Sequence, residues 1–305
     1  MQRYLLSRLV QSLFLLIGVL LIVFFMIRLT GDPVSLMVPK EASAEDREAF
    51  REAMGFNRPL LVQFTDFATG VIQGDFGNSL NFRQPALDLI VQRLPATIQL
   101  ATTALMFGML LAIPLGIIGG FNPGSAIDSI GRTLGLIGQT IPSFVLALIF
   151  ILIFAVKLRW FPSFGRDSAL SVVLPSVALG LGSMGQLVRL TRSAVLEIRN
   201  EDYIRTARSK GLSQYAIAAR HVFRNAAIAL ISVIGVQYGY LLGGSIYIET
   251  IFSWPGLGNL LQQSITARDF PLVQAIAFFI AFFVVALNLL TDFAYAVIDP
   301  RIRFS

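Results

Sequence analysis

The sequence predicts an all-α membrane protein with six transmembrane helices and with both termini in the cytoplasm. The 305-residue chain is 55% hydrophobic and 14% charged, whereas a soluble domain carries about 25% charged residues. Its mean hydropathy of +0.72 also excludes a single soluble globule and a disordered chain. Long intervals contain no charged residue, and basic residues gather in one segment between two of these intervals. These features describe a chain that crosses a bilayer several times.

Charge-free intervals locate the spans, because a hydrocarbon core about 30 Å thick needs about 20 helical residues. The convincing intervals are residues 9–27, 94–127, 133–156, 168–188, 225–248 and 270–291. The second is longer than one span requires, and Pro95 and the turn at 122–124 place its core at residues 97–120. A further interval, 250–267, is interrupted by Gly, Pro and polar residues. We expect it to form a structured loop.

The first interval also has one property of a secretion signal, since Arg3 and Arg8 precede it. Its apolar run is longer than the 7–15 residues of a signal-peptide core, and no small-residue cleavage site follows it. We therefore expect residues 1–30 to stay in the protein as an N-terminal transmembrane helix.

The distribution of Lys and Arg predicts the orientation in the membrane. Eight basic residues lie in the segment 189–224, which must then be cytoplasmic. Residues 95–305 form a five-helix core that includes this cytoplasmic loop, at 190–225. The formal net charge of +6 is explained by orientation. It therefore does not indicate a nucleic-acid partner, and membrane lipid is the expected environment.

Residues 31–94 form a large extracytoplasmic loop with short amphipathic helices. Ser43 can cap one helix, which has acidic residues in its first turn and Gly55 as its terminator. Pro59 starts a second amphipathic stretch. This loop either covers the ends of the transmembrane helices or provides a docking surface for an external partner, and composition alone leaves both alternatives open.

The cytoplasmic loop contains one short helix with clearly marked ends. Asn200 can act as its N-cap, and Gly211 can adopt the left-handed conformation that ends a helix. Such a short helix is marginal in water, so it needs a surface to dock against. Tyr203, Ile204 and Ala207 share one helical face and can supply that contact. A solvated basic loop that serves only topology is the alternative.

Polar and helix-breaking residues inside the spans indicate a wet pathway or close helix contacts. Gln139 and Gln237 are weak candidates for the lining of a translocation path, although either can simply bridge two helices. Pro142 removes a backbone hydrogen bond, so the freed group must find protein or water in a cavity. Gly131 and Gly135 stand four residues apart and allow a neighbouring helix to approach closely.

The residue inventory argues against catalysis by this chain. It has no Cys and one His, so thiolate and histidine metal sites are not expected. None of its lysines, Lys40, Lys157 and Lys210, follows a Gly, as a phosphate-binding loop requires. Asp292 is the only acid inside a predicted span, near its cytoplasmic end, where a structural hydrogen bond is expected. We predict no catalytic residue, no resident cofactor and no metal.

Four sequence strings resemble a known family. The string EDYIRTARSKG at 201–211, followed by HVFRNA at 221–226, resembles the cytoplasmic loop motif of permease subunits from ABC importers. It is most similar to the dipeptide, oligopeptide, glutathione and nickel group. GDP at 31–33, ETIFSWPGLG at 249–258 and IDPRIR at 298–303 agree with this group. The general importer motif begins with Glu-Ala-Ala, and its replacement by Arg205-Thr206-Ala207 matches the version of the peptide group.

The resemblance implies the type I permease fold of ABC importers, and the long outer loop is similar to that of the first of two unlike permeases. It implies a homologous second permease, two cytoplasmic ATPase subunits that bind ATP and Mg, and an extracytoplasmic solute-binding protein. It further implies a bacterial or archaeal cytoplasmic membrane. The expected solute is a short peptide or a related small molecule, which the chain helps to move without hydrolysing ATP itself.

The resemblance also assigns roles to residues. The coupling helix that docks on an ATPase would comprise Asp202, Tyr203, Ile204, Arg205, Thr206, Ala207, Arg208, Lys210 and Gly211. A loop that gates the outer mouth or contacts the binding protein would include Trp254, Pro255, Gly256 and Gly258. The alternative class is a secondary transporter driven by an ion gradient, which should show inverted repeats and midplane carboxylates, and neither is visible. A membrane scaffold or enzyme is disfavoured because no catalytic constellation is present.

Overall fold

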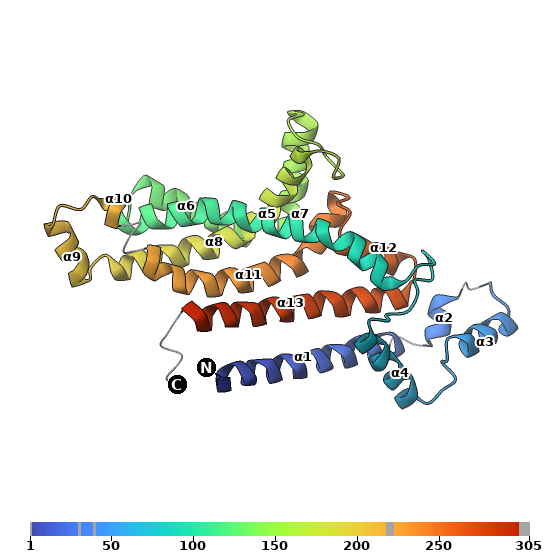
Figure 1. Ribbon diagram of the computed structural model, residues 1–305. Coiled ribbons are helices and arrows are strands. Elements are labelled where there is room, and N and C mark those ends of the chain that lie inside the picture. The colour runs from blue at the N-terminus through green and yellow to red at the C-terminus, as the bar shows by residue number, and fades with distance from the viewer. Residues whose placement is uncertain (1, 30–31, 39–40, 218–222, 299–305) are drawn as a thin grey trace.

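The computed structural model describes residues 2–29, 32–38, 41–217 and 223–298. Within these ranges the regular structure is helical, apart from an isolated bridge between Asn78 and Pro85. The long helices lie side by side with their axes roughly parallel (Figure 1). They are α1 (Gln2–Leu29), α5 (Ala86–Phe121), α6 (Ala126–Thr140), α8 (Val173–Ile198), α11 (Phe223–Ile251) and α13 (Phe270–Ile298).

Short helices gather at the two ends of this bundle (Figure 1). At one end are α2 (Pro33–Met37), α3 (Ala44–Ala53), α4 (Leu60–Gln73) and α12 (Leu257–Thr266). At the opposite end are α9 (Asp202–Ser209) and α10 (Gln214–Ile217). Helix α1 begins and α13 finishes at the end that carries α9. This arrangement agrees with both ends of the chain lying on the side of the predicted cytoplasmic loop.

Among the described residues, four helices are long and apolar enough to cross a membrane, and a bent helix pair raises the number to five. The four spans are Leu6–Met26, Ala86–Phe121, Ala169–Ile198 and Phe270–Phe293. Helix α11 is not among them, and the side chains of its first turns lie outside the described residues. The structure therefore supports a multi-pass helical membrane protein, and the sixth span stays a prediction.

The predicted third span, 133–156, is a bent helix pair and not one straight helix. Helix α6 ends at Thr140, and the chain continues as α7 (Ser143–Phe150) and the π-helical η1 (Ile151–Lys157) after a bend of 104°. Pro142 causes the break, because it has no N–H and because it disfavours helical geometry at the preceding residue. Ile141 is accordingly extended, with φ −89° and ψ 123°. Helices α7 and η1 form an arm that projects from the bundle (Figure 1).

Helix α5 begins at Ala86, after Pro85, so it is longer at its start than the predicted span and contains Pro95 inside. Its C-terminal half packs on α8 at glycines. A Cβ atom on Gly116 would lie 2.6 Å from the Thr191 Cβ, and one on Gly120 would lie 2.5 Å from the Val195 Cβ. The backbones of α5 and α8 can therefore approach closely because these glycines carry no side chain, which is typical of small-residue packing in membranes.

The outer-loop helices follow the predicted signals. Ser43 and Asp46 form a reciprocal capping box at the start of α3, and Gly55 has the left-handed φ of +69° after its end. Helix α4 follows Pro59, although Pro59 itself is the N-cap and Leu60 the first helical residue. The ring of Phe24 on α1 contacts the ring of Phe64 on α4, with centroids 5.2 Å apart. Helix α4 is thus packed on the first span.

The interval 250–267 contains more helix than the sequence predicts. Residues 252–256 form an irregular break after α11, but α12 then occupies Leu257–Thr266. The Gly and Pro residues that suggested a loop all lie before or at the first turn of α12, where they do not interrupt it. Buried Asp269 then fixes the turn into α13, since its carboxylate accepts hydrogen bonds from the hydroxyl of Ser79 and from the Asn81 N–H.

We predict that Gly116→Val destabilises the protein, because the new side chain meets Thr191 and the Val188 carbonyl, 3.0 Å away. Overpacking of this kind costs about 1–3 kcal/mol. Thermal unfolding in detergent, followed by intrinsic tryptophan fluorescence, would measure the loss. Gly18→Val is the matched control, since a Cβ there meets nothing within 4 Å. Equal melting temperatures for the two variants would contradict the packing argument.

Candidate functional site

Helix α9 starts one residue later than the sequence predicts. The Glu201 carbonyl accepts the first hydrogen bonds of the helix, from the N–H groups of Ile204 (3.0 Å) and Arg205 (3.2 Å). Glu201 is therefore the residue at the start, and the predicted N-cap, Asn200, lies in the preceding turn. At the other end, Gly211 adopts the left-handed conformation with φ +77°, as its position after the helix predicts.

One face of α9 is docked on the chain itself. Ile204 and Ala207 are buried in a cluster with Val195 of α8 and Ile217 of α10. This cluster provides the surface that a marginal eight-residue helix requires. The apolar face of α9 is thus occupied within the chain, and it fixes the helix at the C-terminal end of α8.

The opposite face of α9 is exposed and polar. The side chains of Asp202 and Arg205 are 96% and 72% exposed, and they form only a loose ion pair with 3.5 Å between Oδ1 and Nη1. Tyr203, Thr206 and Lys210 are also exposed. These five residues of the predicted coupling element share one accessible surface. The side chain of Arg208 lies outside the described residues, as do residues 31, 221–222 and 299–303 of the family strings.

A buried carboxylate connects α6 to α8 just before the loop that contains α9. Asp128, in the first turn of α6, accepts hydrogen bonds from Arg192 Nε at 2.6 Å and from the Gly124 N–H at 2.9 Å. Arg132 lies 3.5 Å from the same carboxylate. Since Arg192 belongs to α8, the pair ties α8 to α6 just before the chain reaches α9.

A second buried carboxylate organises the end of the bundle opposite α9 (Figure 1). Glu249, near the end of α11, accepts hydrogen bonds from the Thr97 hydroxyl of α5 and the Gly258 N–H of α12, both at 2.7 Å. The Asn259 N–H and the Ser245 hydroxyl are each 3.2 Å away. One buried side chain therefore joins three helices, α5, α11 and α12.

Trp254 completes the same cluster, which we call the outer clamp (Thr97, Glu249 and Trp254–Gly258). Its indole N–H donates to the Ala96 carbonyl at 2.8 Å, and the Leu257 N–H donates to the Thr97 hydroxyl at 2.8 Å. A Cβ on Gly256 would lie 2.5 Å from the carboxyl carbon of Glu249, so only glycine fits. The predicted outer-gate residues are thus interior parts of one interhelical contact.

The predicted path residues Gln139 and Gln237 line one cavity of about 470 Å³. Gln139 comes from α6 and Gln237 from α11, and the cavity opens beside the break at Pro142. Gln186 and Arg189 of α8 also line it. Arg189 Nη1 donates to Gln139 Oε1 at 2.6 Å. The two glutamines do not contact one another directly among the described hydrogen bonds, so they are lining residues of a shared polar space.

Three buried acids lie outside the sequence-based predictions: Asp128, Glu249 and Asp269. Their partners stand far away in the sequence, and no local spacing identifies them. The family string at 249–258 contains Glu249 and was the only signal for it. Asp292 does have a helix-end partner, since Arg8 Nε of α1 lies 3.5 Å from its Oδ2. Within the described ranges, no three His, Cys, Asp or Glu side chains are placed to hold a metal ion.

Residues 112–304 match the family described as binding-protein-dependent transport system inner membrane component. Residues 1–101 match its N-terminal membrane component. The chain belongs to this family of transport permeases. Family membership favours a transport permease component over a secondary transporter driven by an ion gradient.

Relatives that match over their whole length carry related names. A putative peptide transport system permease protein of Brucella abortus (strain 2308) is 39% identical and covers 100% of both chains. The glutathione transport system permease protein GsiC of Salmonella choleraesuis (strain SC-B67) is 38% identical, again with 100% coverage of both. The peptide-group resemblance of the four strings therefore extends to the full chain.

The fold of this permease family is also found in a solved structure. The MetNI methionine ABC transporter in an inward-facing conformation is 21% identical, with a TM-score of 0.55, and the match covers 69% of this chain and 96% of that chain. The sequence-based prediction of an ABC importer permease fold is confirmed.

We predict that Glu249→Gln lowers stability, because an amide presents N–H donors where the carboxylate accepts hydrogen bonds from Thr97, Gly258 and Asn259. A buried donor left without an acceptor costs about 1–3 kcal/mol. Thermal unfolding in detergent would detect this loss. Glu197→Gln, at an exposed position on α8, is the control. A Glu249→Gln protein as stable as the control would refute the clamp.

Proposed function

We propose that this chain is the first of two unlike permease subunits in a binding-protein-dependent ABC importer, and that it forms half of the path for short peptides or a related small solute. Support for the solute class comes from the full-length relatives named for peptide and glutathione transport. The chain would cross a bacterial or archaeal cytoplasmic membrane six times with both termini inside. ATP and Mg would be bound by the partner ATPase subunits.

The observation that carries the proposal is the position of α9. Its apolar residues Ile204 and Ala207 hold it on α8, while Asp202 and Arg205 face outward with little pairing. A helix that is fixed on one side and exposed on the other is suited to transmit a push. We propose that it is the coupling helix, seated in a groove of an ATPase, and that closure of the ATPases displaces it together with α8.

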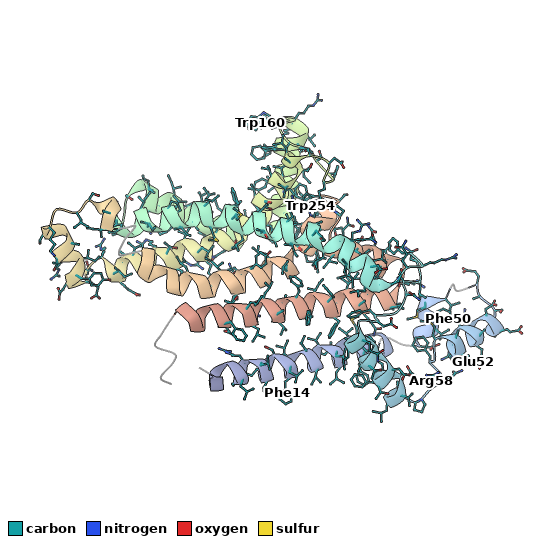
Figure 2. All side chains as sticks on the ribbon, viewed as in Figure 1. Phe14, Phe50, Glu52, Arg58, Trp160 and Trp254 are labelled. Atoms are coloured by element: carbon teal, nitrogen blue, oxygen red, sulfur yellow. The ribbon has the colours of Figure 1, made fainter. Side chains whose placement is uncertain are left out.

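The apolar arm supports a partner within the membrane. Phe144, Leu148, Leu152 and Val156 are exposed along α7 and η1. Figure 2 shows Trp160 at the tip of the arm and Trp254 near its base in the bundle. An exposed apolar surface of this kind is acceptable in a bilayer but also offers contact area to another permease. We propose that the homologous second permease packs against this arm.

At the outer end we propose two contacts. The outer loop, 31–94, would receive the solute-binding protein on helices α3 and α4 and the segment between them, where Glu52 of α3 and Arg58 of the connecting segment are exposed (Figure 2). The outer clamp would gate the outer mouth, because separation of α5 from α11 and α12 requires the hydrogen bonds of Thr97 with Glu249 of α11 and with Leu257 of α12 to break. The clamp therefore links the outer opening to helix movement.

Co-purification tests the proposal. The chain should bring down a second multi-span permease and ATPase subunits from its native membrane, and the assembled complex should take up short peptides with ATP. Arg205→Glu, on the exposed face of α9, should reduce ATPase recovery and peptide uptake by about 10-fold or more, as for a charge reversal at an interface.

Arg83→Glu is the matched control, since Arg83 is exposed at the outer end of the bundle. It should retain the ATPase subunits. Transport by the purified chain without any ATPase, or equal ATPase recovery for Arg205→Glu and Arg83→Glu, would contradict the proposal.

A further inference from the structure

The polar cavity is lined by a positively charged side chain whose role the coupling proposal does not explain. Arg189 of α8 lines the cavity with Gln139, Gln186 and Gln237. It also lines a second cavity of about 370 Å³, which Arg132 and Arg192 share. Arg189 therefore stands at the junction between the two cavities. The second cavity lies beside the Asp128 pair, toward the end of the bundle that carries α9.

The arginines of the second cavity differ in their pairing. Among the ion pairs of the described residues, Asp128 is shared by Arg192 at 2.6 Å and Arg132 at 3.5 Å, and none includes Arg189. The Arg189 guanidinium instead donates a hydrogen bond to the neutral Gln139 amide oxygen. An arginine has five N–H donors, so most of them are available after one bond to Gln139.

Close packing at glycines of α6 and α8 determines where the side chains of Gln139 and Arg189 lie. A Cβ on Gly185 would overlap the Gly135 carbonyl and would lie 2.8 Å from Gln139 Nε2. Helices α6 and α8 are thus in backbone contact at this level, and the Gln139 amide lies across the surface of α8. The hydrogen bond to Arg189 follows from this contact, and it holds the guanidinium fork at the cavity wall.

The cavity lining distinguishes a solute site from a lipid site. Surface grooves elsewhere on the molecule are entirely apolar, as at Leu21, Ile22, Phe25 and Met26 of α1. Another lies at Met106, Leu110 and Pro114 of α5. Acyl chains suit those grooves. The Arg189 cavity has amide, hydroxyl and guanidinium groups instead, which suit a hydrated polar solute.

We propose that Arg189, oriented by Gln139, is a carboxylate-binding station in the translocation path. The fork of an arginine matches the two oxygens of a carboxylate, and the Gln139 Nε2 provides a further donor beside it. A single pair in a wet cavity is weak, so the solute can leave again, as conduction requires. The ligand class is a small solute with a free carboxylate, such as a peptide C-terminus. This inference rests on the proposed import function.

The natural absence of Cys from the chain permits a direct test. In the assembled complex, Gln186→Cys places a single thiol in the cavity, one helical turn before Arg189. Its reaction rates with methanethiosulfonates bearing a sulfonate or a trimethylammonium group would be measured on this chain. The anionic reagent should react faster, and Arg189→Gln should lower the ratio of the two rates by about 5-fold or more, as expected for removal of a nearby charge.

Arg132→Gln in the same Gln186→Cys background is the matched control, because it removes an equal charge that is paired with Asp128. It should leave the rate ratio within about 2-fold, since its cavity is the neighbouring one. Trialanine at millimolar concentration should slow the anionic reagent, and trialaninamide should not. Arg189→Gln should abolish this difference.

The proposed carboxylate-binding role of Arg189 would be wrong if Arg189→Gln left the ratio of the two reaction rates unchanged. It would also be wrong if the faster reaction of the anionic reagent disappeared when phosphatidylglycerol was added to phosphatidylcholine vesicles, because a lipid headgroup would then occupy the guanidinium. These results leave the import function intact, since uptake with ATPase partners is measured separately. Conversely, an anion preference in a chain that recovers no ATPase would refute only the proposed function.

Discussion

The structure depends on the close contact of α8 with α5 and α6. Glycines on α5 meet Thr191 and Val195, and glycines on α6 meet the backbone of α8 near Gly185. Backbone contacts of this kind leave no flexible side chains between the helices that could rearrange, so α8 cannot slide or tilt alone. Because α8 runs from the polar cavity to the turn before α9, the cavity and α9 are joined by one rigid element.

Buried carboxylates secure the two ends of this rigid body. Asp128 ties α6 to α8 through Arg192 at the end that carries α9, and Glu249 ties α11 to α5 and α12 at the opposite end. Each satisfies several donors at once, which suits a low-dielectric environment where an unpaired polar group is expensive. A movement that breaks one set of bonds must therefore be driven from outside the chain, in agreement with a subunit that transmits work done by others.

Local features of this fold could be predicted from the sequence, and interactions between distant segments could not. Ser43, Gly55 and Gly211 mark helix ends through the geometry of their own backbone, and the structure has helix ends at or beside them. Asn200 was one residue away from the true helix start, because neighbouring Glu201 makes the first carbonyl bonds. Pro142 predicted a disturbed helix but not a bend of 104°, whose direction depends on what the arm packs against.

In the candidate sites, too, local features could be predicted from the sequence and contacts between distant segments could not. The family string predicted α9. The polar character of Gln139 and Gln237 suggested a wet pathway, and the structure places both residues beside one cavity. Arg189 was assigned by charge to the cytoplasmic loop, and only the packing of α6 on α8 shows that it faces the cavity. Trp254, Pro255, Gly256 and Gly258 were predicted from the sequence to gate the outer mouth, and the contacts of this segment with Ala96 and Thr97 could be found only from the fold.

The rigid connection can be measured most directly by electron–electron distance spectroscopy in the assembled complex. Spin labels at Met106→Cys on α5 and Ser209→Cys on α9 use two exposed positions of a chain without natural Cys. The account predicts that their distance changes by less than about 2 Å between the nucleotide-free and ATP-bound states, since packed helices move together. A change of about 5 Å, one helical turn, would show that α9 moves independently and would contradict the account.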